Sequence, residues 1–180
     1  MRPSLHFQMI RVPDDAEALA DWLFSEVWPY HSPSSLSREQ TVQRILEGAF
    51  SGSNQRTFWI TYQGERAGLV KLFDLDDIGD GYPLFDLRIR QAFRGQGIGE
   101  QALKWLTRYL FESWPELERI EGTTRHDNLA MRRVFRKCGY LKEGHYRQAW
   151  KGFDAIHYSC LRQDWESGTV TPVNWDDEPS

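Results

Sequence analysis

Three glycines in the segment Arg94–Gly99 carry the clearest chemical signal in this sequence. Gly95, Gly97 and Gly99 lie between a strand-like segment and a helix-like segment. Glycine lets backbone N–H groups approach an oxyanion with no Cβ in the way. A helix start adds unpaired N–H donors and the positive end of the helix dipole, and Arg94 adds a positive charge. The segment therefore predicts a cradle for a pyrophosphate group.

Two common phosphate-binding motifs do not fit these glycines. A dinucleotide fingerprint requires G-x-G-x-x-G, and Glu100 occupies the third glycine position. A P-loop requires Gly-Lys followed by Ser or Thr, and the sequence contains no such run. A tight strand-to-helix turn that binds no ligand stays as the structural alternative.

The elements that must position this turn alternate between strands and helices. Apolar residues at period two predict a strand over 84–90, in which Asp86, Arg88 and Arg90 share the polar face. Apolar residues three and four apart predict four helices. The first begins after Asp15, and the second begins at the capping box of Ser37 and Gln40. The third precedes a further strand predicted over 118–124, and the fourth follows that strand. The remaining strands are predicted over 5–11, 57–62, 67–73, 140–150 and 154–164, with a hairpin turn over residues 63–66. This order predicts one mixed α/β domain over residues 1–165 and a tail over 166–180.

Composition limits the class of protein. The chain has 180 residues, Lys and Arg total 22, Asp and Glu total 26, and the net charge is −4. An acidic balance argues against a nucleic-acid partner. Two cysteines provide neither a disulfide framework nor a four-ligand zinc site, so we expect no metal. With no apolar run of membrane length and no signal-peptide pattern, we expect no membrane partner and a cytoplasmic location.

Two motifs together resemble the GCN5-related N-acetyltransferase (GNAT) family. Arg94, Gly97 and Gly99 match its Q/R-x-x-G-x-G/A motif, and the run from Asp127 to Tyr140 is similar to its next block. Glu143-Gly144, Asp154, Tyr158 and Trp165 resemble the branch that acetylates the N-termini of ribosomal proteins. The resemblance covers roughly residues 5–165. It implies a twisted mixed sheet with splayed parallel strands and helices on both faces.

The resemblance also implies a cofactor site for acetyl-CoA between the strands at 84–90 and 118–124. Leu87 and Ile89 would bind the pantetheine arm through their main chain. Asn128 would bind this arm or hold the strands, and Arg133 or Lys137 would meet the 3′-phosphate. A solvated helix face is the alternative for Arg133. The pyrophosphate would lie on the N–H groups of Arg94, Gly95, Gln96, Gly97, Ile98 and Gly99.

The catalytic groups are less clearly marked. Many family members use a Tyr seven residues after the Asn as the acid that protonates the departing thiolate, and Phe135 occupies that position here. The candidates for the base that deprotonates the amine are Asp86 and His126. A structural role is the alternative for each region: Asp86 pairs with the arginines of its strand, and Asp127 caps the following helix.

The amine acceptor would lie beside the connection between the first two helices. Trp28, Tyr30, His31 and Phe73 are the candidates to line its pocket, and core packing is the alternative for the aromatic residues. The expected partner is a small-molecule amine or a peptide N-terminus, and the protein would be a monomer or a homodimer. The expected function is acetyl transfer from acetyl-CoA to a primary amine by direct attack. A non-catalytic acyl-CoA sensor and a nucleotide-binding module are the alternatives.

Overall fold

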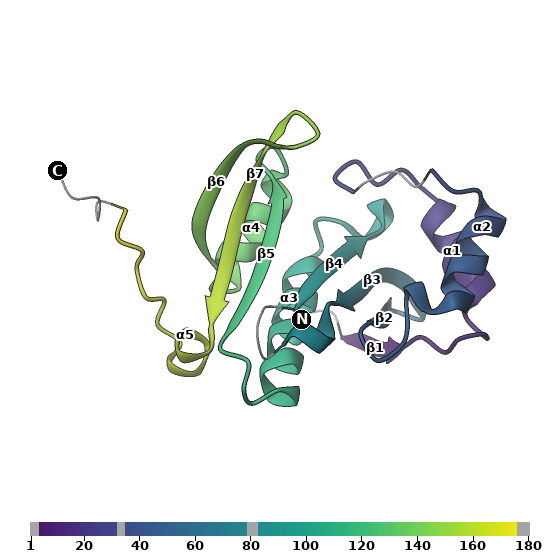
Figure 1. The fold of residues 1–180 in the computed structure, drawn as a ribbon, viewed down its shortest axis with the longest axis horizontal. Coiled ribbons are helices and arrows are strands. Elements are labelled where there is room, and N and C mark those ends of the chain that lie inside the picture. The colour runs from purple at the N-terminus through teal and green to yellow at the C-terminus, as the bar shows by residue number, and fades with distance from the viewer. Residues whose placement is uncertain (1–3, 32–34, 79–82, 176–180) are drawn as a thin grey trace.

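Two antiparallel sheets lie side by side in this protein (Figure 1). The computed structural model describes residues 4–31, 35–78 and 83–175. The first sheet has the order β1 (Leu5–Met9), β2 (Arg56–Tyr62), β3 (Glu65–Phe73) and β4 (Leu84–Ile89). The second sheet has the order β5 (Arg119–Arg125), β7 (Phe153–Leu161) and β6 (Leu141–Trp150). The helices are α1 (Ala16–Phe24), α2 (Arg38–Arg44), α3 (Ile98–Ser113), α4 (Leu129–Lys137) and α5 (Arg162–Ser167).

The expected α/β class is confirmed, and the structure adds a division of the sheet. Strands β4 and β5 contact each other but belong to different sheets. Within the described residues, every hydrogen-bonded strand pair is antiparallel. The division leaves backbone groups of β4 without a strand partner on the side that faces β5, which matters for the site described below.

Helices cover both faces of the first sheet, as expected. Phe58 and Ile60 of β2 pack into the core shared with α3. Trp59 points to the opposite face and packs with Leu19 of α1. This alternation follows from the period of two along a strand. The core on the α3 side continues to Phe135 of α4, so one apolar core joins the two sheets.

Local sequence signals set several element boundaries. Ser37 and Gln40 form the predicted capping box at the start of α2. Gln63 and Gly64 make the predicted turn between β2 and β3, with φ of 51° and 83°. Two positive φ values are typical of the tight turns that suit the right-handed twist of a hairpin. These two predictions are confirmed.

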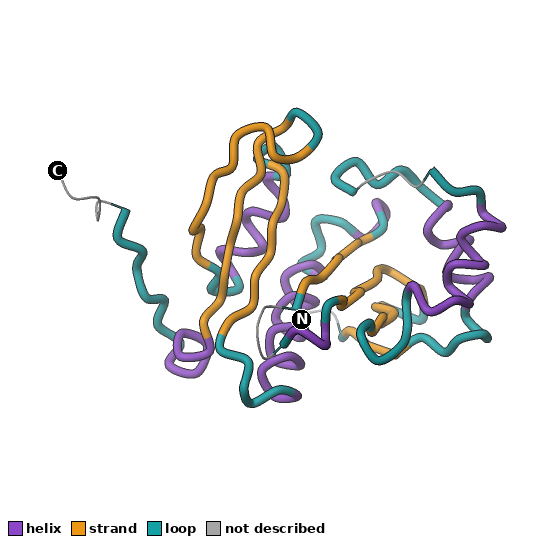
Figure 2. The backbone as a smooth tube through the Cα atoms, in the orientation of Figure 1, coloured by secondary structure: helices purple, strands orange, loops and turns teal. Residues whose placement is uncertain are grey.

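The C-terminal segment leaves the domain after α5 (Figure 2). Helix α5 runs across the expected boundary at residue 165 and ends at Gly168, which has φ of 70°. The Arg162 guanidinium donates hydrogen bonds to the carbonyls of Phe111, Leu117 and Trp114. These bonds fasten α5 to the end of α3. No helix in the described part of the chain is long and apolar enough to cross a membrane.

Candidate active site

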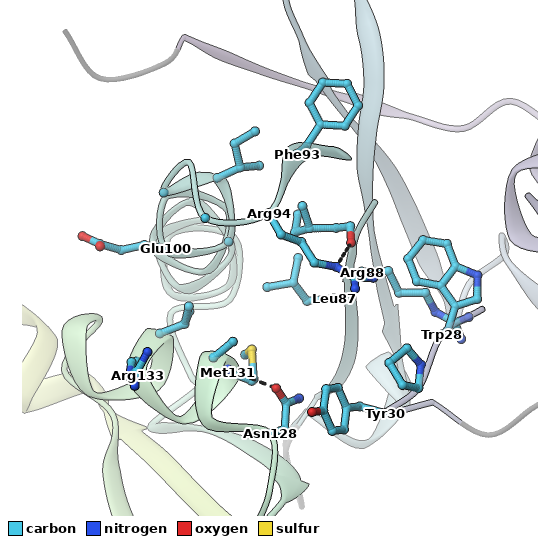
Figure 3. Close-up of a pocket in the computed structure, with 18 of the residues that line it drawn as sticks. Trp28, Tyr30, Leu87, Arg88, Phe93, Arg94, Glu100, Asn128, Met131 and Arg133 are labelled. Atoms are coloured by element: carbon cyan, nitrogen blue, oxygen red, sulfur yellow. Dashed lines mark hydrogen bonds between the residues drawn. The ribbon is translucent and has the colours of Figure 1, made fainter. Parts of the chain in front are cut away.

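A cavity of about 360 Å³ lies where β4, α3 and α4 meet (Figure 3). It brings together nine of the ten residues expected to bind the cofactor: Leu87, Ile89, Arg94, Gly95, Gly97, Ile98, Gly99, Asn128 and Arg133. The tenth, Gln96, turns away, and its side-chain amide donates to the carbonyl of Ala92 at 3.1 Å. We call this space the first cavity.

The glycine turn presents backbone donors to the first cavity. Gly95 and Gly97 have φ of 76° and 79°, a left-handed conformation that other residues adopt only with strain. Gly97 is the N-cap of α3 and offers no side chain to the helix. The first N–H groups of an α-helix have no partner within the helix. This end of α3 can therefore bind an anion through its main chain.

The Arg94 side chain is held by contacts within the protein. Its guanidinium donates to the carbonyl of Ile89 at 2.9 Å and to the Glu26 carboxylate at 3.0 Å. Glu26 also accepts from the N–H of Gln91 at 3.0 Å. The positive charge of Arg94 is thus compensated by a carboxylate. The side chain fixes the turn to β4 and to the segment after α1, while the backbone of the turn faces the cavity.

The opposite wall of the first cavity is the start of α4. The Asn128 side chain accepts a hydrogen bond from the Met131 N–H at 3.2 Å and donates to Thr124 Oγ1 at 3.0 Å. Asn128 is therefore the helix cap and also ties α4 to β5. The expectation that Asp127 caps this helix is wrong, because the Asp127 carboxylate pairs with the Arg125 guanidinium instead. Asn128 also lines the cavity, which is compatible with its expected contact to a ligand.

Two cations of α4 lie at the mouth of the first cavity. Arg133 and Lys137 both line it, and both are exposed. The Lys137 ammonium lies 3.5 Å from the Glu100 carboxylate, and the Arg133 side chain has no ion pair within the described residues. These residues fit a phosphate at the mouth of the cavity.

A second cavity of about 360 Å³ continues from the first between β4 and β5. The two cavities share six lining residues: Tyr30, His31, Leu87, Arg88, Asn128 and Met131. The expected pocket residues Tyr30, His31 and Phe73 line the second cavity, and Trp28 lines the first. The wall also contains residues that the sequence did not indicate, among them Phe85, Thr123, Thr124 and Trp150.

A cluster of three charged or titratable side chains, His31, Asp86 and Arg88, lines the second cavity. His31 Nε2 is 2.9 Å from Asp86 Oδ1, and the Arg88 guanidinium donates twice to Asp86 Oδ2, at 2.9 Å and 2.7 Å. Burial alone would raise the pKa of Asp86. The contacts with His31 and Arg88 outweigh burial and bring the pKa down to about 2. Asp86 is therefore a carboxylate at neutral pH and a weak proton acceptor.

Phe135 fills the position where the family resemblance implies an acid. Its ring is buried and stacks on Tyr158 with a centroid distance of 4.7 Å. Its para carbon lies 2.5 Å from the place that a Cβ on Gly122 would occupy. The ring therefore occupies the space left by the missing side chain of Gly122. The para edge of the ring therefore lies against the backbone of β5 at Gly122.

His126 does not line either cavity. Its N–H donates to the Asp154 carbonyl at 2.9 Å, its carbonyl accepts from Arg132, and its ring lies beside Phe153. Of the two candidate bases, only Asp86 lines one of the two cavities, the second. The sequence does not separate the two candidates, because Asp86 lies on β4 and His126 directly follows β5, the two strands expected to border the site.

Cys138 is a packed thiol. Burial raises its pKa to about 12, and Sγ donates to the carbonyl of Glu100 at 3.4 Å. A reactive cysteine requires a thiolate, and this environment disfavours one.

Comparison with known proteins agrees with this geometry. Residues 5–141 match the family described as Acetyltransferase (GNAT) domain. The protein therefore belongs to the GNAT family of acetyltransferases, as the two motifs predict. A search of curated protein sequences gave no match.

Solved structures show the same fold. A probable acetyltransferase has a TM-score of 0.74 and 24% identity, over 89% of this chain and 94% of that chain. RimL, a ribosomal L7/L12 alpha-N-protein acetyltransferase solved with coenzyme A, has a TM-score of 0.73 and 22% identity, over 88% and 94%. The aminoglycoside acetyltransferase AAC(6′)-Ib, also solved with coenzyme A, has a TM-score of 0.74 and 18% identity, over 91% and 98%.

Proposed function

We propose that this protein transfers an acetyl group from acetyl-CoA to a primary amine by direct attack. The observation that supports this most is the continuity of the two cavities. A cradle of backbone donors opens into a second space of similar volume, and His31, Leu87 and Arg88 line both. Acetyl-CoA supplies an activated thioester, and such a passage would let an amine reach it from the other side.

The residues of the first cavity fit this co-substrate. The N-terminus of α3 and the glycine turn suit a pyrophosphate, because both present N–H groups. Arg133 and Lys137 suit the 3′-phosphate. The side of β4 that has no strand partner, around Leu87 and Ile89, can hydrogen-bond an extended arm as an added strand would.

Direct attack is supported by the chemistry of the one cysteine near the site. A covalent acyl-enzyme needs an activated nucleophile beside a base. Cys138 is held as a thiol and is not among the described residues that line the two cavities. The described lining of the second cavity contains no cysteine or serine, and the hydroxyl of its Thr123 lies 3.0 Å from His157 Nδ1.

The second cavity favours an amine with a single charge and an apolar neighbourhood. Among its described lining residues the one carboxylate is Asp86, and Arg88 compensates it. Tyr30, Phe73 and Trp150 contribute aromatic surface. The similar structures act, by their names, on a protein α-N-terminus, on aminoglycosides and on spermidine. A peptide N-terminus or a small apolar amine fits the described walls better than a polycation.

The test is a panel of acceptors with release of CoA as the readout. We expect turnover with peptides that have an apolar first residue or with monoamines, and less with spermidine and aminoglycosides. Calorimetry with acetyl-CoA and, separately, with ATP tests which of the two ligands the first cavity binds. Binding of ATP without binding of acetyl-CoA would contradict the proposal and would favour a nucleotide-binding module.

A non-catalytic acyl-CoA sensor is the second candidate, because Phe135 replaces the expected acid. The same panel separates the two functions. Tight binding of acetyl-CoA without turnover of any amine would favour the sensor.

A further inference from the structure

A histidine and an aspartate that are far apart in the sequence meet between the two cavities. His31 follows α1, Asp86 lies on β4, and their side chains approach to 2.9 Å. His31 lines both cavities. Its second nitrogen, Nδ1, is buried and has no hydrogen-bond partner within the described residues. A buried polar atom without a partner needs an explanation, and one explanation is a proton-donating ligand.

The segment that contains His31 is held in place by α1, by its own backbone and by the second sheet. The Trp28 indole donates to the carbonyl of Leu23 at 2.8 Å, and the His31 N–H donates to the carbonyl of Trp28 at 3.1 Å. From the second sheet, the Arg125 guanidinium donates to the carbonyl of Pro29 at 3.3 Å. These contacts position the imidazole before any ligand binds.

The charges around the imidazole are mixed. The charged and titratable groups that face it from the described elements are Asp86 and Arg88 of β4, Lys71 of β3 beside Asp86, and Tyr30 with Arg125 and Asp127 on the side of β5. Asp86 Oδ1 lies 2.9 Å from His31 Nε2. In a neutral imidazole, a proton on the nitrogen that faces this carboxylate leaves the lone pair on Nδ1.

From this arrangement we propose that His31 accepts the proton of the acceptor amine and that Asp86 is its positioning residue. This inference rests on the proposed function and names the base for it. The imidazole takes one proton from the ammonium group, directly or through one water. The neutral amine attacks the thioester carbonyl, so that a C–N bond forms as the C–S bond breaks. The amine's second proton and the imidazolium's proton are then available to the CoA thiolate and to solvent.

The two side chains have different roles. The contacts of Asp86 with His31 and Arg88 outweigh burial and lower its pKa, so that Asp86 is a carboxylate at neutral pH and a weak proton acceptor. An imidazole titrates in the range in which a general base is effective. Arg88 thus keeps Asp86 charged, and Asp86 orients His31.

A kinetic experiment compares three variants at saturating acetyl-CoA over pH 5–9. We expect His31→Gln to lower kcat by about 100-fold or more, the scale of general base catalysis, with acetyl-CoA affinity by calorimetry unchanged. Asp86→Asn should move the acidic limb of the kcat/KM profile to lower pH by about one unit. A merely structural role of Asp86 would lower the rate without moving that limb.

The chain offers a matched control for these variants. His145 Nε2 lies 2.7 Å from Asp154 Oδ2, and this pair lines neither cavity. His145→Gln removes an imidazole that is paired with a carboxylate, as His31→Gln does, but at an exposed position on β6. It should leave kcat and the pH profile unchanged.

A second readout does not depend on turnover. NMR of ¹⁵N-histidine-labelled protein without ligands follows each imidazole during a pH titration, and His31→Gln identifies the resonance of His31. We expect Asp86→Asn to shift the midpoint of this resonance to lower pH, and Asp154→Asn to leave it in place.

The outcomes are distinguishable. Wild-type turnover together with an unchanged kcat in His31→Gln would overturn the base and leave the acetyltransferase intact. An unshifted His31 titration in Asp86→Asn would overturn the positioning role. Absence of wild-type turnover with every amine would reject the proposed function, and the base with it.

Discussion

The two cavities of this protein have similar volumes but are built in different ways. The first is formed largely by two continuous segments, residues 94–100 and 128–137, and its main polar groups are backbone donors and exposed cations. The second takes residues from at least five separate segments, and its Asp86 carboxylate is partly buried and lies beside both His31 and Arg88. The difference teaches that a turn that presents backbone donors can be encoded locally by glycines, whereas a pocket lined by side chains of several elements depends on contacts between distant parts of the chain.

The largest expected effect is at the point where the second cavity meets the core. Phe135→Tyr places a hydroxyl against β5, because the para carbon of Phe135 already occupies the space of a missing Cβ at Gly122. We expect a loss of about 1–3 kcal/mol in the free energy of unfolding, as for other overpacked cores, and no gain in kcat. Urea denaturation and steady-state kinetics measure the two effects. Normal stability with a raised kcat would show that this site can accept the missing acid.

The next effect concerns the charge on the floor of the second cavity. The pKa of Asp86 is about 2, below its usual value of 3.8, because His31 and Arg88 outweigh burial. A carboxylate whose pKa is lower in the folded state than in the unfolded state stabilises the fold at pH values above the pKa of the unfolded state. This contribution to stability is lost as the pH falls toward the pKa of the folded state. The shift corresponds to about 2 kcal/mol. Asp86→Asn should therefore be less stable than wild type by about 2 kcal/mol at pH 7.

This difference in stability has a defined pH window. It should shrink between pH 4 and pH 2, where the wild type itself loses the carboxylate. Chemical denaturation across this range measures it. An equal difference at pH 7 and pH 2 would indicate that packing, rather than charge, accounts for the effect of the substitution.

A smaller effect tests the first cavity through a matched pair of glycines. Gly97 has φ of 79° at the start of α3, and Gly64 has φ of 83° in the turn between β2 and β3. Neither has an atom within 4 Å of an added Cβ. Each substitution to Ala should therefore cost about 1–2 kcal/mol of backbone strain.

The two variants should differ in acetyl-CoA binding. Gly97→Ala should weaken it by about tenfold, because that strain falls on the backbone donors of the turn. Gly64→Ala should leave it unchanged. Calorimetry measures both affinities, and equal affinities would remove the phosphate role from the glycine turn.

The smallest effect concerns the exposed cations of the first cavity. Lys137→Ala should weaken acetyl-CoA binding by about two- to fivefold at low salt and by less in 0.5 M salt, because exposed charges are screened. Arg136→Ala is the control, since Arg136 is an exposed cation on the same helix that does not line the cavity. Equal losses in both variants would point to the general charge of α4 instead of a phosphate contact.

Prediction from sequence succeeded where the signal is local. The capping box at Ser37, the hairpin turn at Gly64 and the helix start at Gly97 depend on backbone conformations set by a few neighbouring residues. The prediction that Asp127 caps α4 was wrong, because two neighbouring residues carry the same local signal. Asp127 and Asn128 are both good capping residues, and only the contact of Asp127 with Arg125 across the strand end decides between them.

The compensation of Arg94 was beyond the reach of the sequence. Its partner Glu26 is 68 positions away, and the pairing depends on how the segment after α1 packs against the turn. The contribution of Trp150 to the second cavity depends in the same way on the pairing of the end of β6 with β7, where Trp150 lies opposite Phe153. Neither residue type, by itself, indicates a partner so distant in the chain.

The sequence by itself determined the class of fold, the family and the glycine turn at the start of α3, because glycine positions and apolar periodicity act through local backbone geometry. The tertiary structure decided which polar groups meet at the junction of the cavities. It paired Asp86 with His31 and Arg88, left His126 outside and placed Phe135 under Gly122. These relations depend on the packing of separate elements against one another, and only the folded chain specifies that packing.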